Sequence, residues 1–230
     1  MIDIHSHILP NVDDGSDGME TSLAMLREAA GLGVSDIFLT PHYMRFRNYL
    51  SPSSINREIF SRVLEEVKRE KLPIKLHLGN EIYYSVDMLD AIRKGVVLPL
   101  GDSDKILIEF SLLEEEDDIG EAIANVISLG YVPVIAHLER YPYVSKTKDY
   151  EIMKRMGALI QVNARSIVRH SDFAAHNKAM KLLKAGLVDF VASDQHRPGH
   201  NHMKEAYIFV SRKYGKQIAE KLFVNKSVIK

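Results

Sequence analysis

Short apolar runs alternate along the chain with longer stretches in which apolar residues recur every three or four positions. The short runs predict buried strands, and the longer stretches predict amphipathic helices. The predicted strands span residues 2–5, 36–40, 74–78, 105–110, 132–136, 159–162 and 189–192. The predicted helices lie near 19–32, 54–70, 86–93, 118–129, 148–156, 172–185 and 202–213. Strands that alternate with helices indicate an α/β fold with a parallel sheet, either doubly wound or closed into a barrel.

Glycine marks four of the predicted helix ends, in the segments AAGLGVSD, SLGYVP, RMGALI and KAGLVD. Glycine adopts the left-handed conformation that closes a helix C-terminus without steric cost. Each segment leads directly into a predicted strand, so these four junctions are the best defined boundaries. No clear repeat, low-complexity segment or linker divides the sequence, and we therefore expect a single domain over residues 1–230.

Composition narrows the classes of function. The 30 lysines and arginines nearly balance the 31 aspartates and glutamates, so no global charge attracts nucleic acid or an anionic membrane. No apolar stretch approaches the roughly 20 residues that span a bilayer, and no secretory leader is evident, so we expect a cytoplasmic protein. The sequence contains no cysteine, which excludes disulfides, thiolate metal sites and cysteine nucleophiles.

Side chains that commonly bind metal ions follow six of the seven predicted strands. The carboxyl ends of the strands in α/β folds meet on one face, so these side chains should converge there. The candidates are His5, His7, His42, Glu81, Glu109, His137, Asp194 and His196. The sixth strand ends in Asn163, which is not a usual ligand. A single histidine in such a place is more often structural, so the argument depends on how many such groups converge.

Asp13 and Asp14 lie in the loop NVDDGSDG after the first strand and could reach the same face. We expect one of them to bind metal and the other to cap the turn or the following helix. We favour Asp14 as the ligand. The remaining histidines are expected on the surface or in loops, although two of them follow the last strand closely enough to line the pocket. They are His77, His170, His176, His200 and His202, of which the last two are the pair near the pocket.

The spacing of two pairs suits chelation. Alternate residues of a strand point to the same side, so His5 with His7, and Asp194 with His196, each present two ligands side by side. A cluster of imidazoles and carboxylates without sulfur suits zinc, manganese or iron, and it contains more ligands than one ion needs. We therefore expect two or three divalent ions, whose charge would offset that of the carboxylates.

The motifs HSH, TPH, GNE, IEF, AH and SDQH, in this order, resemble those of the PHP (polymerase and histidinol phosphatase) superfamily of trinuclear metal phosphoesterases. Within it, MIDIHSHILPNVDDG, VIAHLERY, QVN and FVASDQH look like the bacterial tyrosine-protein phosphatases of capsular and exopolysaccharide biosynthesis operons. The resemblance extends from Met1 past His202. It implies the PHP fold, a distorted (β/α)7 TIM-like barrel with its metal site at the C-terminal ends of the strands.

The resemblance also implies how the ligands divide among the metals. One metal is expected on His5, His7, Glu81 and Asp194. A second is expected on Glu81, as a bridge, with Glu109 and His137. A third is expected on Asp14, His42 and His196. Manganese is the expected ion, with zinc or iron as alternatives.

Hydrolysis would use a metal-bridging hydroxide, because coordination lowers the pKa of water to about 7 in favourable sites. His42 or His196 is expected to assist as an acid where it is not committed to metal. Arg140, three residues beyond His137, is the candidate for binding phosphate, because its planar guanidinium matches phosphate oxygens and the resemblance places such an arginine there. The alternative is a salt bridge from Arg140 to Glu139 or to another carboxylate at the rim.

Further arginines are weaker candidates for substrate binding. Relatives supply a second phosphate-binding arginine after the Asp-x-His pair, but the loop here, RPGHNHM, is shorter than expected and Arg197 is only an approximate counterpart. Arg45 and Arg47 follow His42 in HYMRFR, where they would meet a negatively charged peptide or lie in a solvated loop. Arg165, in QVNARS, is a candidate to contact a metal-bound water or the phosphate, as is Asn163 in the same segment.

The leading hypothesis is a metal-dependent phosphatase that acts on phosphotyrosine in the tail of a bacterial tyrosine autokinase controlling polysaccharide export. Without cysteine, such hydrolysis has to proceed through metal-activated water. One alternative keeps the fold and changes the substrate, giving a small-molecule phosphatase of the histidinol-phosphate type or a phosphodiesterase. The other is a metal-stabilised binding module without turnover, against which the full ligand set and Arg140 argue.

Overall fold

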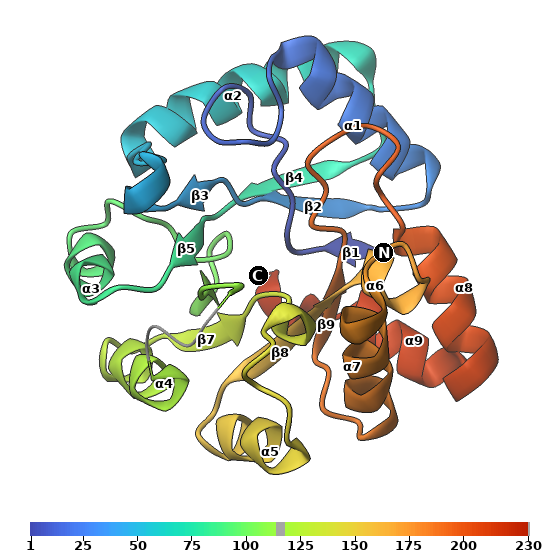
Figure 1. The fold of residues 1–230 in the computed structure, drawn as a ribbon. Helices are drawn as coiled ribbons and strands as arrows, with labels where there is room; N and C mark the ends of the chain where they lie inside the picture. Colours follow the sequence, from blue (N-terminus) through green and yellow to red (C-terminus); the bar gives the residue numbers. More distant parts are fainter. Residues whose placement is uncertain (114–117, 230) are drawn as a thin grey trace.

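The computed structural model describes residues 1–113 and 118–229, in which parallel strands curl around a central axis and helices cover their outer side (Figure 1). The strands are β1 (Ile2–Asp3), β2 (Asp36–Leu39), β3 (His42–Tyr43), β4 (Lys75–Leu78), β5 (Glu81–Tyr83), β6 (Lys105–Glu109), β7 (Val132–Ile135), β8 (Leu159–Asn163) and β9 (Phe190–Ala192). They pair in the orders β1-β2-β4 and β3-β5-β6-β7-β8-β9. The predicted fold class, an α/β barrel of parallel strands, is confirmed.

Two of the seven predicted strands are interrupted, which explains the two extra strands in the described residues. The predicted strand 36–40 continues beyond Pro41 as β3, and the predicted strand 74–78 continues beyond Asn80 as β5. Pro41 has no N–H to pair, and its carbonyl instead accepts hydrogen bonds from the backbone of Glu81 and the side chain of Asn80. The sequence analysis did not predict either break.

The first and last strands meet where they end. The backbone N–H of Asp194 donates to the carbonyl of His5 at 3.0 Å, and that of His7 donates to the carbonyl of Gln195 at 2.9 Å. These bonds join the segment after β1 to the segment after β9, although almost the whole chain separates them in sequence. The first and last pairs of candidate ligands are therefore side by side.

The helices agree with the predicted ranges to within one residue at each end, and two further helices were not predicted. They are α1 (Met19–Gly31), α2 (Ser53–Glu70), α3 (Val86–Arg93), α4 (Ile119–Ser128), α5 (Thr147–Arg155), α6 (Ala164–Ile167), α7 (Phe173–Lys184), α8 (Met203–Tyr214) and α9 (Lys216–Phe223). The unpredicted helices are α6 and α9. In the described part of the chain, no helix combines the length and apolar character needed to cross a membrane.

Glycines close the helices at all four predicted junctions. Gly33, Gly130, Gly157 and Gly186 have φ angles of 88°, 86°, 101° and 68°. These values lie in the left-handed region that side chains with a Cβ rarely adopt. The backbone conformation inferred from the sequence is thus present at each junction.

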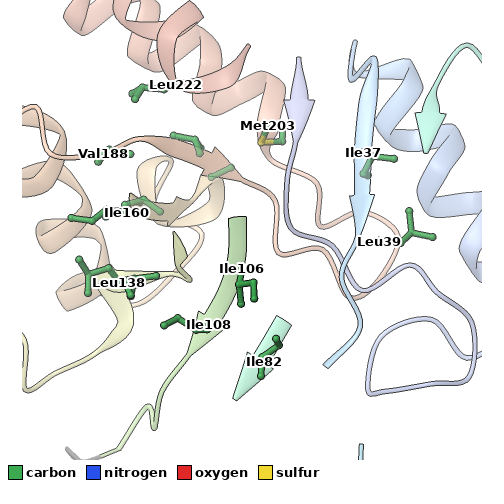
Figure 2. Close-up of a cluster of buried hydrophobic side chains, with 14 of the residues drawn as sticks. Ile37, Leu39, Ile82, Ile106, Ile108, Leu138, Ile160, Val188, Met203 and Leu222 are labelled. Carbon is green, nitrogen blue, oxygen red and sulfur yellow. The ribbon is translucent and has the colours of Figure 1, made fainter. Parts of the chain in front are cut away.

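Apolar side chains divide between the two sides of the strands. On β6, Ile106 and Ile108 belong to the large cluster between the strands and the helices, part of which is shown in Figure 2. Leu107, between them in sequence, belongs to a smaller cluster with Phe38 and Phe190 that fills the barrel. Successive strand residues face opposite sides, so polar side chains that continue this inner row stand at the barrel mouth.

Candidate metal centre

The inner row of side chains becomes polar where the strands end. On β6 the inward position after Leu107 is Glu109, and after β9 the inward position following Ala192 is Asp194. Both carboxylates are buried, at 4% and 7% exposure. Strand alternation therefore carries these two side chains to the barrel mouth from elements far apart in sequence.

Four buried side chains form what we call the inner group: His5, His7, Glu81 and Asp194. The Nε2 atoms of His5 and His7 lie 3.1 Å apart, and Glu81 Oε2 lies 3.1 Å from the first and 3.2 Å from the second. Asp194 Oδ1 lies 3.5 Å from both imidazoles. Donors that share one ion with bonds of about 2.0–2.2 Å lie roughly 3 to 3.5 Å apart, so the spacing of this group suits a single cation.

Glu81 also reaches a middle group, made of Glu81, Glu109 and His137. Glu81 Oε1 lies 2.9 Å from His137 Nε2, which in turn lies 3.7 Å from Glu109 Oε2. One carboxylate thus contacts imidazoles of two groups through its two oxygens. This is the arrangement required of a bridging ligand.

The outer group consists of Asp14, His42 and His196 and lies nearer to solvent. Asp14 Oδ1 is 3.6 Å from His42 Nε2 and 3.5 Å from His196 Nε2. The side chains of Asp14 and His196 are 37% and 30% exposed. His42 also lies beside the other groups, since its Nδ1 is 3.0 Å from Glu81 and 2.9 Å from Glu109.

The two neighbouring aspartates have different surroundings. Asp13 Oδ2 accepts a hydrogen bond of 2.8 Å from His7 Nδ1 and another from the backbone N–H of His42, while its Oδ1 accepts from the turn N–H of Gly15. Asp13 therefore orients His7 so that Nε2 faces the inner group. Asp14 instead points toward the outer group, and its role as a ligand stays a prediction.

A glutamine that the sequence analysis did not select orients two other candidate ligands. Gln161 Oε1 lies 3.1 Å from His5 Nδ1 and accepts a hydrogen bond from the backbone N–H of His137. Its amide donates to Asn163, whose own amide donates to Asp194 Oδ2 at 2.7 Å. The sequence did contain a signal for Gln161. It precedes Asn163 by two residues on β8, so the two side chains must face the same side of the sheet.

Two candidate ligands have an unusual backbone. His137 and Asp194 have φ angles of 34° and 52°, in the left-handed region that non-glycine residues avoid at a cost of about 1–3 kcal/mol. Ala136 belongs to the inner cluster, so regular alternation would send His137 outward. The left-handed turn brings its imidazole back to the mouth.

The donor set fits divalent cations. In the described residues, several buried atoms of the centre make no hydrogen bond: Asp14 Oδ1, His42 Nδ1, Glu81 Oε2 and Glu109 Oε1. The last three of these atoms have ion-pair contacts with one another, but burying such groups without hydrogen bonds is costly. Cations would remove that cost, and a set of carboxylates and imidazoles without sulfur suits manganese, zinc or iron.

Charges within the centre compensate one another. Burial would raise the pKa of Glu81 and Asp194, but the surrounding histidines hold both well below the usual range. Burial opposes protonation of His42, yet the adjacent Glu81 and Glu109 raise its pKa to about 9. The pKa values of His5 and His7 are raised as well, so without metal protons on these three histidines offset the carboxylate charge, and a cation has to displace them.

Arg140 lies on the wall of the cavity above these groups. It ends the short helix η2 (Leu138–Arg140), and its Nη1 lies 3.4 Å from Asp194 Oδ2. The sequence analysis considered a salt bridge from Arg140 to Glu139 or to another carboxylate at the rim. The structure shows the second, with Asp194 as the carboxylate. Glu139 is instead buried and accepts hydrogen bonds from the Asn163 backbone and the Ser166 hydroxyl. The Arg140 side chain remains 36% exposed and lines a cavity of about 500 Å³ together with all the metal-ligand candidates except His5 and His7.

The other three arginines proposed for substrate binding differ in where they lie. Arg197 Nη1 donates to the carbonyls of Asp14, Gly15 and His196. Arg45 pairs with Asp87 at 3.0 Å. Arg47 lines the cavity and lies 3.5 Å from Asp14. Their contacts with a substrate stay predictions, and in this structure Arg197 binds backbone rather than facing the cavity.

Comparison with known proteins shows close relatives over nearly the whole chain. The family described as capsular polysaccharide synthesis, CpsB/CapC, matches residues 1–229. The tyrosine-protein phosphatase CpsB of Streptococcus agalactiae is 37% identical over 235 residues, which cover 97% of this chain and 95% of that protein. The tyrosine-protein phosphatase YwqE of Bacillus subtilis is 30% identical and covers 100% of this chain and 91% of its own.

Solved structures give a consistent result. A structure from work on YwqE of Bacillus subtilis and CpsB of Streptococcus pneumoniae, described as metal-dependent tyrosine phosphatases, matches with a TM-score of 0.88 at 29% identity. The match covers 95% of this chain and 90% of that one. Histidinol phosphate phosphatase of Lactococcus lactis matches with a TM-score of 0.56 at 16% identity, covering 96% and 95%. The second likeness concerns the fold alone.

Proposed function

The chain belongs to the CpsB/CapC family of capsular polysaccharide synthesis, and from this premise we propose that it is a metal-dependent tyrosine-protein phosphatase. The protein contains no cysteine, so the activity does not involve a thiolate nucleophile. We propose two or three divalent ions, with manganese first and zinc or iron as alternatives. The proposed ligands are His5, His7, Asp14, His42, Glu81, Glu109, His137, Asp194 and His196.

One observation carries the assignment to an aryl phosphate. The cavity that has the ligand candidates as its floor and Arg140 on its wall also has an apolar side, which includes Phe46, Tyr83 and Leu113. Phe46 and Leu113 are 66% and 87% exposed, so their apolar surface is open to a ligand in the cavity. The rings of Phe46 and Tyr83 meet edge to face at 4.7 Å. A phosphotyrosine needs such a surface for its ring beside a charged site for its phosphate.

Different residues would have different roles in hydrolysis of the phosphate. Bound metal ions would lower the pKa of water to supply a nucleophile and would neutralise phosphate charge. Asp13 and Gln161 hold His7 and His5 in the ligating orientation, and Arg140 would bind the phosphate oxygens. His196 at the exposed edge, or His42, would give a proton to the leaving tyrosinate, which needs little help because its pKa is only about 10.

The names of the relatives indicate the class of the natural substrate but not which protein it is. Relatives named tyrosine-protein phosphatases imply a protein that carries phosphotyrosine, and we propose the tail of a bacterial tyrosine autokinase that controls polysaccharide export. Arg45 and Arg47, beside the apolar side of the cavity, are proposed to meet acidic parts of that tail. A single domain over residues 1–230 and a cytoplasmic location complete the proposal.

The test compares substrates in parallel on metal-reconstituted protein: a phosphotyrosine peptide, the matching phosphoserine peptide and histidinol phosphate. We expect the phosphotyrosine peptide to be preferred and chelation to abolish turnover. Arg140→Ala should lower kcat/KM by about 100-fold, which corresponds to the loss of a phosphate contact worth about 3 kcal/mol. Phe46→Ala should raise KM for the peptide while leaving hydrolysis of a small phosphate monoester without an aromatic ring unchanged. A preference for histidinol phosphate would favour the small-molecule alternative, and turnover that survives chelation would contradict the mechanism.

A further inference from the structure

A second hollow adjoins the metal centre. It has a volume of about 510 Å³ and shares Arg165, Asp194 and His196 with the catalytic cavity. Its far side is formed by the α6–α7 connection and the segment that leads into α8. A group bound in this hollow would therefore lie directly beside a phosphate bound at the metal centre.

Arg165 connects the two cavities and has no counter-charge. Within residues 1–113 and 118–229 its guanidinium makes neither an ion pair nor a hydrogen bond, and its side chain is exposed. The other arginines at the mouth are engaged, Arg47 and Arg140 with carboxylates and Arg197 with carbonyls. Arg165 is thus the one arginine among these four that is free to bind an added anion.

The far side of the hollow adds further donors. His170 and His202 stack at 4.3 Å between ring centroids, and His200 lies between α8 and the last strand. Even when neutral, each imidazole offers one N–H. Helix α8 begins at Met203, so the positive end of its dipole lies beside the hollow. These features together favour a negatively charged ligand.

A cation is the competing occupant, because His170, His202 and Glu205 are close enough to bind a metal ion. Glu205 Oε2 lies 3.5 Å from His170 Nε2 and 3.7 Å from His202 Nδ1. Arg165, however, lines the same hollow, and its fixed positive charge disfavours a second positive charge there. His170 and Glu205 are also more than half exposed, which is a poor setting for holding an ion.

We infer that this hollow binds an anionic side chain of the peptide substrate, a carboxylate or phosphate next to the scissile phosphotyrosine, and that Arg165 is its principal contact. The inference rests on the proposed function. Arg165 would then determine specificity by favouring phosphotyrosines that have an acidic or phosphorylated residue next to them in the peptide. Glu205, which lies beside His170 and His202, limits the affinity because its charge repels the same group.

The test uses fluorescent peptides in which a non-hydrolysable phosphonate replaces phosphotyrosine, with glutamate, phosphoserine or glutamine as the neighbouring residue on each side in turn. Anisotropy with the manganese-loaded full chain gives Kd. We expect the anionic peptides to bind about tenfold more tightly than the glutamine peptide on at least one side. Arg165→Gln should reduce this preference, measured as the ratio of the Kd values of the glutamine and anionic peptides, below about twofold, and Glu205→Gln should increase it.

Arg169→Gln is the matched control, because its guanidinium bonds His176 away from the hollow and the preference should persist. Equal binding of glutamate and glutamine peptides by the unmodified protein, or an unchanged preference in Arg165→Gln, would overturn the inference. Loss of a bound metal equivalent in Glu205→Gln would instead assign the hollow to a cation. Hydrolysis of a small aryl phosphate reports the metal centre alone, so its absence would contradict the proposed function while the binding comparison, which needs no turnover, still decides the subsite.

Discussion

The inner and outer groups of the metal centre use the same types of ligand but are built differently. In the inner group, His5 and His7 are fully buried, and each has its second nitrogen held by a polar partner, Gln161 or Asp13. In the outer group, Asp14 and His196 are about a third exposed. The Nδ1 atom of His196 lies 3.0 Å from the backbone carbonyl of Asp194 and 3.6 Å from the carboxylate of the same residue, which is itself a candidate ligand.

This difference should determine how tightly each position binds metal. Ligands whose orientation is already fixed lose little conformational freedom when an ion binds, and partners of the second nitrogen typically change metal affinity by about 10–100-fold. We therefore expect the inner position to retain its ion under conditions in which the outer position exchanges. The consequence for catalysis is that the outer ion would be the one whose concentration limits activity.

The largest effect should come from Glu81, which joins the groups. Glu81→Gln removes the charge of the proposed bridge but keeps the size of the side chain. We expect kcat on a phosphotyrosine peptide to fall on the order of 1000-fold, which is several kcal/mol of transition-state stabilisation, and bound metal to fall by at least one equivalent. Glu65→Gln, an exposed position on α2, is the control. Activity within tenfold of the original at saturating metal would show that Glu81 bridges nothing.

A comparison of His5→Ala with His196→Ala tests the difference between the groups directly. His5→Ala should lose the inner ion and nearly all activity, and added metal should not restore it. His196→Ala should lose about 10–100-fold at limiting metal and recover in part when metal is raised, because it weakens only the outer position. Metal content after gel filtration measures which ions each variant retains, and activity as a function of metal concentration measures the recovery. Equal loss and equal recovery in the two variants would mean that the groups do not differ.

The sequence predicted the parts of this centre that follow regular strand geometry. Glu109 continues the inward row of β6 after Leu107, and the pair of His5 and His7 follows from two-residue spacing. The helices were predictable because their apolar period is clear and glycine closes four of them. Metal-type residues at strand ends were therefore recognisable before their distances were known.

Irregular backbone conformations could not be predicted in this way. His137 was selected as a candidate from its place after a strand, but the left-handed φ of 34° that turns its side chain to the mouth is indicated by no local pattern. Gln161 has the appearance of an ordinary strand residue until His5 is placed beside it by the closure of β1 onto β9. The direction of Arg197 likewise depends on where the loop carbonyls lie. His137 was selected from its place at the end of a predicted strand, and the likeness to a known family then supported it and Arg140; neither line of reasoning selected Gln161.

A smaller effect is expected from Asp13, which orients His7 without facing the group of ligands. Asp13→Asn keeps the shape but replaces a carboxylate by an amide beside His7 Nδ1. We expect the metal concentration for half-maximal activity to rise about tenfold, and kcat at saturating metal to change less than threefold. Asp17→Asn, an exposed aspartate in the same loop, is the control. A loss of kcat that metal cannot restore would place Asp13 among the ligands instead of Asp14.

The smallest effect is expected from Arg197, where the sequence and the structure suggest different roles. The structure shows its guanidinium holding the carbonyls of Asp14, Gly15 and His196, so it fastens together the two segments that carry the outer group. Hydrogen bonds of this kind contribute about 0.5–1.5 kcal/mol each, so Arg197→Ala should raise the metal concentration for half-maximal activity by about 3- to 10-fold. KM for the peptide at saturating metal should stay unchanged, because the guanidinium does not face the cavity. Steady-state kinetics across metal and peptide concentrations separate the two quantities. A rise in KM with unchanged metal dependence would instead establish Arg197 as the second phosphate contact. It would also mean that Arg197 does not stabilise the loops that carry the outer group.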